Sequence, residues 1–168
     1  MGSYNYGKDE IVKWIKDRFP EGATCLDVGA CDGKWSTLLR NHLEMYACEI
    51  WKPNVDKIAG KYEVVFWTDI SQLFYPYYDL VIFGDVLEHM SVEKAQKVLE
   101  YAKDHCKDYI VAVPFRYPQG EIYGNPYERH IQDDLTPELF DERYPGHELL
   151  LRPTYNYAYY HQGQSLNK

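Results

Sequence analysis

Short apolar runs alternate with segments whose apolar residues recur at helical spacing, and this alternation covers most of the chain. The first helical segment carries its apolar residues close to one side, at Ile11, Val12, Trp14, Ile15 and Phe19. Pro20 and Gly22 follow it and indicate where the helix ends. The pattern predicts a helix that packs one face against a sheet.

Five further apolar runs have the length and the flanking turn residues of buried strands. We predict these strands at residues 23–28, 45–49, 63–67, 78–83 and 109–113. Helical patterns lie between them, at residues 35–43, 53–59 and 92–102. Strands that alternate with helices favour right-handed crossovers, so the sequence predicts a largely parallel sheet with helices on both faces.

The chain changes character after Pro114, where proline, glycine, tyrosine and charged residues predominate up to about residue 134. We predict a long surface loop at residues 115–134. Thr136 and Pro137 suit the N-cap and the first turn of a helix. Two strand-like runs, at residues 147–152 and 156–161, then predict an antiparallel pair at the sheet edge. The whole pattern predicts one α/β domain over residues 1–168, with a Rossmann-like, doubly wound, mostly parallel seven-stranded sheet that ends in an antiparallel hairpin.

Composition and charge narrow the possible partners of this domain. The 168 residues carry a formal net charge of −8 and no run of Lys or Arg, which disfavours tight binding to nucleic acid. The four cysteines stand singly, without the paired spacing of a zinc or redox motif, at Cys25, Cys31, Cys48 and Cys106. We therefore expect reduced thiols and no metal.

The chain shows no targeting or membrane segment at the level of sequence. Residues 1–16 have no apolar stretch like the core of a signal peptide, and nowhere do eighteen apolar residues run together. We expect a soluble, cytoplasmic protein. The 17 tyrosines are unusually many for this length, and residues 155–160 concentrate them in what is either a sheet face or an aromatic surface for a homodimer.

A glycine-containing turn follows the first predicted strand. Gly29 and Gly33 stand where the strand leads into its helix, so that the backbone can approach a ligand closely or the helix can pack tightly on the strand. The turn by itself leaves the ligand and the purely structural interpretations open.

Carboxylates follow the second and third predicted strands. Glu49 stands 22 residues after Asp27, where doubly wound folds place a carboxylate that accepts hydrogen bonds from ribose hydroxyls; the alternative is an exposed strand end. Asp69 is placed to accept from an adenine amino group, with Ile70 against the ring, or to cap a helix. Trp51 either stacks on the adenine or packs on the sheet edge.

In this order, the segments LDVGACDG, CEI, TDI and LVIFGDVLEHM are similar to successive motifs of class I S-adenosylmethionine-dependent methyltransferases. The resemblance covers residues 24–114, and its DVLEH segment is typical of small-molecule members. It departs from the family at Cys31, where a third glycine is common. The resemblance implies that S-adenosylmethionine contacts Asp27, Gly29, Ala30, Gly33, Glu49, Ile50, Trp51, Asp69, Ile70, Gly84, Asp85 and Val86, with Gly84 and Asp85 beside its methionine end.

Two rival functions keep the same fold. A nicotinamide-dependent reductase is disfavoured because Asp32, beside the glycine turn, would repel a diphosphate, whereas it suits a cofactor with a sulfonium and an ammonium group. A non-catalytic cofactor-binding or scaffold protein remains an open alternative to methyl transfer.

The predicted loop at residues 115–134 is placed to cover an acceptor pocket and supplies aromatic and hydrogen-bonding side chains, for which we predict substrate contacts at Arg116, Tyr117, Tyr123 and Tyr127. The run from Asn125 to Leu139 is similar to a stretch of some bacterial methyltransferases in which a histidine faces the active site. His130 is therefore the first candidate for a general base; the alternative is that it only ties down the loop. His89 is the second candidate, and its alternative is to orient the loop or cap the following helix. We expect O- or N-methylation of a small polar molecule.

Overall fold

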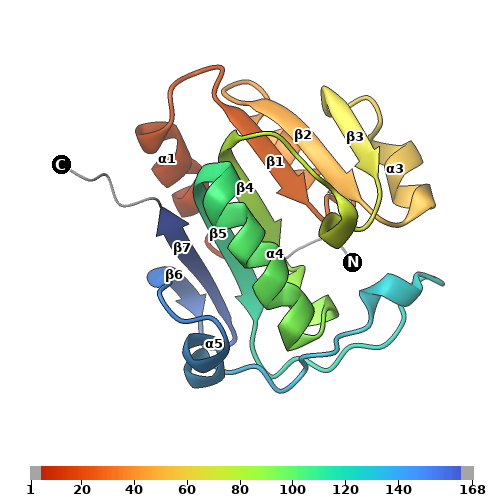
Figure 1. Ribbon diagram of the computed structural model, residues 1–168, viewed down its shortest axis with the longest axis vertical. Coiled ribbons are helices and arrows are strands. Elements are labelled where there is room, and N and C mark those ends of the chain that lie inside the picture. The colour runs from red at the N-terminus through yellow and green to blue at the C-terminus, as the bar shows by residue number, and fades with distance from the viewer. Residues whose placement is uncertain (1–4, 164–168) are drawn as a thin grey trace.

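The computed structural model describes residues 5–163, so the two ends of the predicted 1–168 domain lie outside the described residues. One sheet contains seven strands in the order β3-β2-β1-β4-β5-β7-β6 (Figure 1). The strands are β1 (Thr24–Val28), β2 (Glu44–Glu49), β3 (Val64–Trp67), β4 (Tyr78–Gly84), β5 (Cys106–Pro114), β6 (Glu148–Thr154) and β7 (Tyr157–Gly163). Strands β1 to β5 pair in parallel, whereas β7 is antiparallel to both β5 and β6. This topology confirms the predicted sheet and its C-terminal hairpin.

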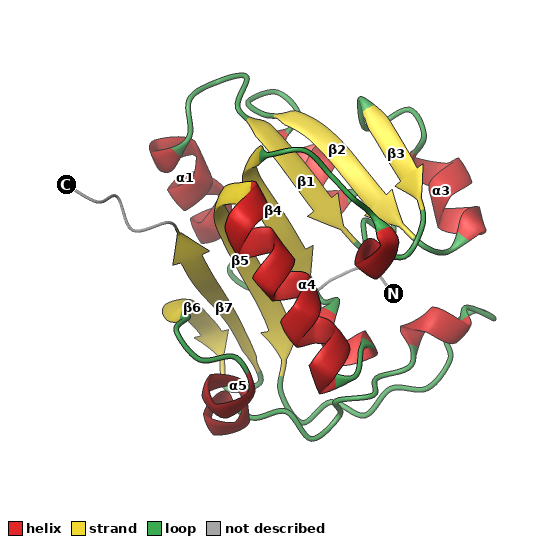
Figure 2. Cartoon of the chain, in the orientation of Figure 1, coloured by secondary structure: helices red, strands yellow, loops and turns green. Residues whose placement is uncertain are grey.

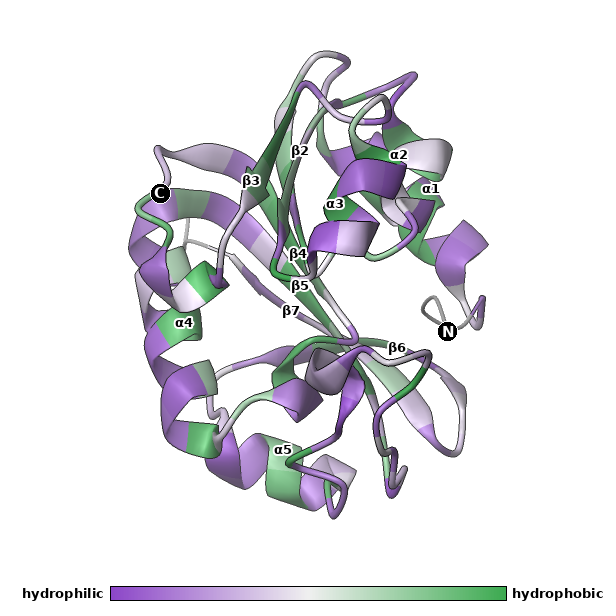
Figure 3. Ribbon diagram, turned by 90° about the vertical axis from the view of Figure 1, so that its right-hand side faces the viewer, coloured by the Kyte–Doolittle hydropathy of each residue, from purple (hydrophilic) through white to green (hydrophobic). Residues whose placement is uncertain are grey.

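Helices cover both faces of the sheet, as Figures 2 and 3 show. The helices are α1 (Lys8–Arg18), α2 (Lys34–Leu39), α3 (Lys52–Ile58), α4 (Val92–His105) and α5 (Pro137–Arg143). Residues of α4 and α5 belong to one apolar cluster, and residues of α1, α2 and α3 belong to the other. Thr136 caps α5 by accepting from the Leu139 amide at 3.1 Å, and Pro137 occupies the first turn, as predicted.

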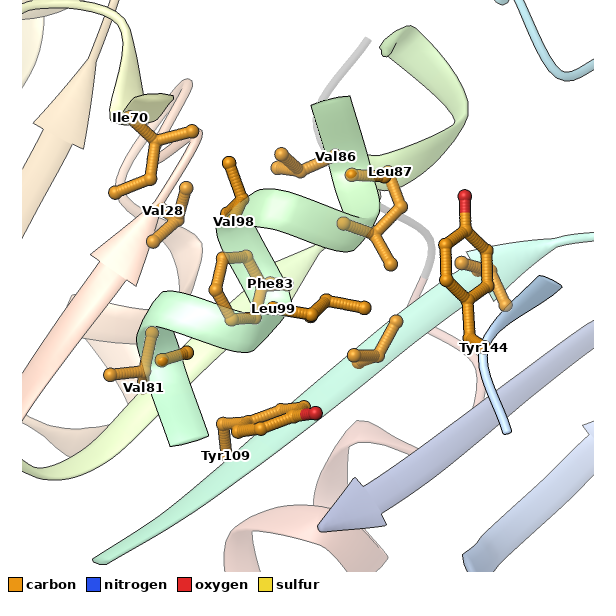
Figure 4. Close-up of a cluster of buried hydrophobic side chains, with 14 of the residues drawn as sticks. Val28, Ile70, Val81, Phe83, Val86, Leu87, Val98, Leu99, Tyr109 and Tyr144 are labelled. Atoms are coloured by element: carbon orange, nitrogen blue, oxygen red, sulfur yellow. The ribbon is translucent and has the colours of Figure 1, made fainter. Parts of the chain in front are cut away.

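The alternation of side chains along the central strands explains why both faces need a helical cover. Val81 and Phe83 of β4 pack toward α4, where Figure 4 shows them beside Val98 and Leu99. The intervening Leu80 and Ile82 belong to the cluster under α1 to α3. Successive residues of a strand point to opposite faces, so a continuous apolar strand is stable only between two layers.

The tyrosines of β7 are part of the core. Tyr157, Tyr159 and Tyr160 are buried, and Tyr160 stacks on Phe140 of α5 at a ring-centroid distance of 3.9 Å. Of the tyrosines at residues 155–160, only Tyr155, in the hairpin turn, is exposed. The sheet-face interpretation of this segment therefore describes the fold.

Among residues 5–163, no helix combines the length and the apolar character that crossing a membrane requires.

The buried carboxylate of Asp108 links α1 to the sheet through hydrogen bonds. Asp108 of β5 is 1% exposed and accepts from Arg18 Nε and Nη2, each at 2.9 Å, while His161 Nε2 of β7 lies 2.8 Å from its Oδ1. Burial by itself would raise the pKa of Asp108, but the hydrogen bonds with His161 and Arg18 outweigh burial and lower the pKa. The ionised carboxylate thus stabilises the fold.

We expect Asp108→Ala to lower the free energy of unfolding at pH 7 by about 2–4 kcal/mol, because hydrogen bonds to charged groups contribute about 1.5–3 kcal/mol each. The folded-state pKa lies below the unfolded value of about 3.9, so this stabilisation is complete above about pH 5 and is lost as the pH falls through the folded-state pKa. Urea unfolding at several pH values measures it. Asp104→Ala, at an exposed position of α4, is the control. A difference between Asp108→Ala and wild type that persists unchanged in acid would contradict the role of the ionised carboxylate.

Candidate active site

A cavity of about 340 Å³ opens at the carboxyl ends of the parallel strands. It lies around β1 and β4, where the strand order changes direction, which is where open α/β sheets bind ligands. Figure 1 shows residues 115–134, which we call the covering loop, running past the tips of these strands. The predicted site residues that line the cavity are Asp27, Gly29, Ala30, Glu49, Ile50, Asp69, Ile70, Gly84, Asp85, Val86, His89, Tyr117, Tyr127 and His130.

Four other predicted site residues do not line the cavity. Gly33 is the N-cap of α2, and Trp51 is the N-cap of α3. Arg116 is exposed at the start of the covering loop, and Tyr123 is 84% exposed at its tip. Contacts of these four residues with a ligand stay predictions.

The turn after β1 places three residues in the left-handed backbone region. The φ angles are 69° at Gly29, 49° at Cys31 and 75° at Gly33. Residues with a side chain are disfavoured in this region of backbone conformation. Glycine would therefore suit the position that Cys31 occupies. A Cβ atom at Gly29 would also overlap Val86 Cγ2, so the turn packs directly on the segment after β4.

Gly29→Ala tests this packing, with Gly22→Ala as a matched control. Gly22 also has a positive φ, of 79°, but a Cβ atom there would meet nothing within 4 Å. Both variants bear the left-handed strain of about 1–2 kcal/mol, and only Gly29→Ala adds an overlap that costs about 1–3 kcal/mol. We expect the free energy of unfolding in urea to fall further for Gly29→Ala by that second amount. Equal losses in the two variants would contradict the close approach of Val86.

Glu49 is held at the end of β2 by the turn itself. Its Oε2 accepts from the Cys31 amide at 2.9 Å and its Oε1 accepts from the Trp51 amide at 2.8 Å. The residue is 5% exposed, and burial raises its pKa. Each carboxylate oxygen has a second lone pair, so the group can accept further hydrogen bonds from a ligand in the cavity.

Asp27 lies at the floor of the cavity and is also buried. It accepts from Tyr62 Oη at 2.6 Å, and burial raises its pKa to about 7. Lys8 of α1 is buried nearby, with Nζ 3.9 Å from the centroid of the Trp35 ring, and burial lowers its pKa to about 8.

The cavity carries a surplus of acidic groups. Its lining includes seven carboxylic side chains and three from Lys and Arg: Asp27, Asp32, Glu49, Asp69, Asp85, Glu88 and Glu128 against Lys34, Lys94 and Arg129. Burial and Asp85 raise the pKa of Glu88 well above its usual range, so the acidic surplus rests on the other six carboxylic side chains. A cavity of this composition favours a cationic ligand over a diphosphate.

Asp69 performs the capping role that the sequence left open. Its Oδ1 accepts from the Ser71 amide at 2.9 Å at the start of the 3-10 helix η1 (Ile70–Gln72), and Lys94 Nζ lies 2.5 Å from its Oδ2. Burial by itself would raise the pKa of Asp69, but these hydrogen bonds lower it. Asp69 lines the cavity as well, so capping and ligand contact are compatible at this residue.

The segment after β4 holds Asp85 in an unusual conformation. Asp85 has a φ of 56°, and its Oδ1 accepts from Tyr157 Oη of β7 at 2.6 Å. Strained backbone of this kind is often found at functional sites. The DVLEH segment therefore begins with a backbone conformation that residues with a side chain rarely adopt.

Two histidines meet between this segment and the covering loop. His89 belongs to the 3-10 helix η2 (Leu87–His89), and its ring centroid lies 4.7 Å from that of His130. His89 Nδ1 is 3.1 Å from the Arg129 carbonyl oxygen and His130 Nδ1 is 2.6 Å from that of Tyr117. Since a carbonyl only accepts, each Nδ1 donates, and in the neutral rings each Nε2 keeps its lone pair. Burial lowers the pKa of both histidines, and His89 further lowers that of His130.

The covering loop is anchored by polar contacts. Gln119 Nε2 donates to the Glu128 carbonyl at 2.7 Å, and the amides of Ile131 and Gln132 donate to the Glu88 carbonyl at 2.7 and 3.0 Å. The buried Gln132 side chain donates to the Leu87 carbonyl at 2.8 Å and hydrogen-bonds Tyr144, the C-cap of α5. These bonds hold the loop against η2 at the cavity.

Several residues of the site carry no signal in the sequence. Lys8, Tyr62 and Tyr157 come from distant elements and reach Trp35, Asp27 and Asp85 only through the tertiary structure.

No protein-family model matches the sequence, and no curated protein is similar to it in sequence. Solved structures with the same architecture include an S-adenosylmethionine-dependent methyltransferase from Clostridium acetobutylicum, at 13% identity and a TM-score of 0.71, over 94% of this chain and 91% of that one. Magnesium protoporphyrin IX methyltransferase from Synechocystis with bound S-adenosylhomocysteine is 19% identical, with a TM-score of 0.59, over 91% and 80% of the chains.

A third neighbour, a TehB-like S-adenosylmethionine-dependent methyltransferase from Corynebacterium glutamicum, is 14% identical, with a TM-score of 0.65, over 94% of this chain and 87% of that one. The likeness extends over nearly the whole chain, and at these identities it concerns the fold. The chain therefore has the Rossmann-like fold of the S-adenosylmethionine-dependent methyltransferases.

Proposed function

We propose that the protein is an enzyme that transfers a methyl group from S-adenosylmethionine to the oxygen or nitrogen of a small polar molecule. The observation that carries the proposal is the placement of Glu49. It stands at the carboxyl end of β2, next to β1 in a methyltransferase-like sheet, and is oriented by the amides of Cys31 and Trp51, with lone pairs left for ribose hydroxyls.

The charge of the cavity supports this cofactor. S-adenosylmethionine carries a sulfonium and an ammonium group, and the lining has four more carboxylic side chains than Lys and Arg side chains, seven against three. The proposed arrangement places the ribose at Glu49, the adenine beside Asp69 and Ile70, and the methionine end beside Gly84 and Asp85. The Synechocystis neighbour binds S-adenosylhomocysteine, the product of such a transfer.

The reaction is an in-line displacement. A lone pair of the acceptor forms a bond to the methyl carbon while the carbon–sulfur bond breaks, and sulfur keeps the electron pair as S-adenosylhomocysteine forms. An acceptor hydroxyl or ammonium group must also lose a proton, and we assign its receipt to His130 Nε2, with His89 beside it. The protein contributes mainly by holding donor and acceptor in line away from water.

The acceptor is expected under the covering loop. Tyr117 and Tyr127 line the cavity and combine an aromatic face with a hydroxyl, whereas Arg116 and Tyr123 stand further out on the same loop. A cavity of about 340 Å³ suits a small molecule, and the net charge of −8 opposes tight contact with nucleic acid.

Two measurements test the proposal in sequence. Titration calorimetry with S-adenosylmethionine and S-adenosylhomocysteine should give one binding site for each. Transfer of a labelled methyl group from S-adenosylmethionine into a metabolite extract should then yield a labelled small molecule. Binding without transfer would instead support the non-catalytic alternative, and absence of binding would overturn the proposal.

A further inference from the structure

Glu88 is a buried carboxylic side chain in an incomplete environment. The residue is 1% exposed, and within residues 5–163 no other residue donates a hydrogen bond to either of its carboxyl oxygens. Its backbone is fixed, because its carbonyl accepts from both Ile131 and Gln132. Burying an unpartnered carboxyl group costs free energy, so such a group calls for a partner that the protein chain itself does not supply.

Two nitrogen donors lie beside this carboxyl group. One donor atom each from Glu88, His89 and His130 can be chosen so that all three lie within 4.8 Å of one another. The Tyr117 carbonyl accepts from Nδ1 of His130 and the Arg129 carbonyl accepts from Nδ1 of His89, whose ring also contacts the Asp85 backbone. With the proton of each neutral ring on Nδ1, Nε2 is the atom that can bind a ligand. Backbone carbonyls commonly orient metal-binding histidines in this way.

We propose that Glu88, His89 and His130 form a binding site for a divalent transition-metal ion at the edge of the cofactor cavity. Two imidazoles and one carboxylate suit Zn²⁺, Fe²⁺ or Mn²⁺ better than Mg²⁺ or Ca²⁺, which prefer oxygen ligands alone. Donor atoms on one Zn²⁺ lie about 3.4 Å apart, given bonds of about 2.1 Å in a tetrahedron. The three donor atoms, which lie within 4.8 Å of one another, must therefore move closer together to bind one ion.

Two consequences follow if an ion binds these three residues. It would join η2 to the covering loop, because His89 belongs to the first and His130 to the second. Three protein ligands also leave at least one coordination position open toward the cavity, as in catalytic metal sites.

A role of the ion in catalysis rests on the proposed function, whereas binding of the ion does not. An acceptor hydroxyl bound at the open coordination position of the ion would have its pKa lowered by the cation. His130 would then act as a ligand, and the acceptor proton would leave to solvent.

The test is calorimetric titration of untagged, chelator-treated and dialysed protein with Zn²⁺ and with Mn²⁺, without any cofactor. We expect one equivalent of at least one ion to bind, and Glu88→Gln and His130→Asn each to weaken its binding by at least about 100-fold. His42→Gln, which removes a histidine outside the cavity, should bind as wild type does.

Circular dichroism controls for folding, and His130→Asn carries the test if Glu88→Gln does not fold. Absence of stoichiometric binding, or equal binding by wild type and the folded variants, would overturn the site. A parallel titration with S-adenosylmethionine distinguishes the metal proposal from the proposed function. It tests whether the cofactor binds, and its result does not bear on whether the metal ion binds.

Discussion

Replacing His130 by alanine is expected to reduce methyl transfer by at least about 100-fold while the Kd for S-adenosylmethionine stays within a few-fold. The expectation follows from position: His130 lines the cavity from the covering loop, its ring is oriented by the Tyr117 carbonyl, and it lies against His89. Positioned acid–base groups contribute about 10²–10⁴ in rate. The loss is expected whether Nε2 receives the acceptor proton or holds a metal ion.

The measurement is labelled-methyl incorporation into the acceptor that a screen of a metabolite extract identifies, with calorimetry for cofactor affinity. His42→Ala serves as the control, because His42 lies in the turn before β2 and bonds the Phe19 carbonyl instead of lining the cavity. Wild-type turnover in His130→Ala would remove this histidine from the mechanism. A parallel loss of cofactor affinity would assign it to the cofactor instead.

Glu49→Ala is expected to weaken S-adenosylmethionine binding by at least about 10-fold. A hydrogen bond to a charged group contributes about 1.5–3 kcal/mol, and the buried carboxylate is placed to accept from the ribose. The substitution also frees the Cys31 and Trp51 amides, so the turn after β1 loses one of its hydrogen bonds to β2 and keeps the one from the Gly29 amide to the Cys48 carbonyl. Both effects act in the same direction on affinity.

Glu44→Ala is the matched control for Glu49→Ala, because Glu44 begins the same strand but is exposed at the opposite end. It should bind S-adenosylmethionine as wild type does. Calorimetry at equal protein concentration compares the three proteins. Unchanged affinity in Glu49→Ala would exclude this carboxylate from the cofactor site and leave the proposed ribose position without support.

The arrangement of elements was predictable from the sequence because its signals are local. The apolar periodicity of α1 and α4, the apolar runs within β4 and β5, and Thr136 followed by Pro137 each depend on near neighbours in the chain. The positions of Glu49 and Asp69 at strand ends follow from the same pattern, because the carboxyl ends of parallel strands share one edge of the sheet.

The contacts between distant elements were not predictable. Tyr62 bonds Asp27 across 35 positions and Tyr157 bonds Asp85 across 72, and no local pattern indicates either pairing. Trp51 and Arg116 show that a correct prediction for one residue does not extend to its neighbour. Ile50 and Tyr117 line the cavity, whereas Trp51 and Arg116, which are next to them in sequence, do not. The isolation of the Glu88 carboxyl group, on which the metal proposal depends, is likewise visible only in three dimensions.

A structure of crystals grown with S-adenosylhomocysteine tests the cofactor assignment most directly. We predict electron density in the cavity around the ends of β1 and β4, with the ribose hydroxyls within hydrogen-bond distance of Glu49 and the amino-acid end beside Gly84 and Asp85. An empty cavity at saturating ligand concentration, or ligand density at another place on the molecule, would contradict it.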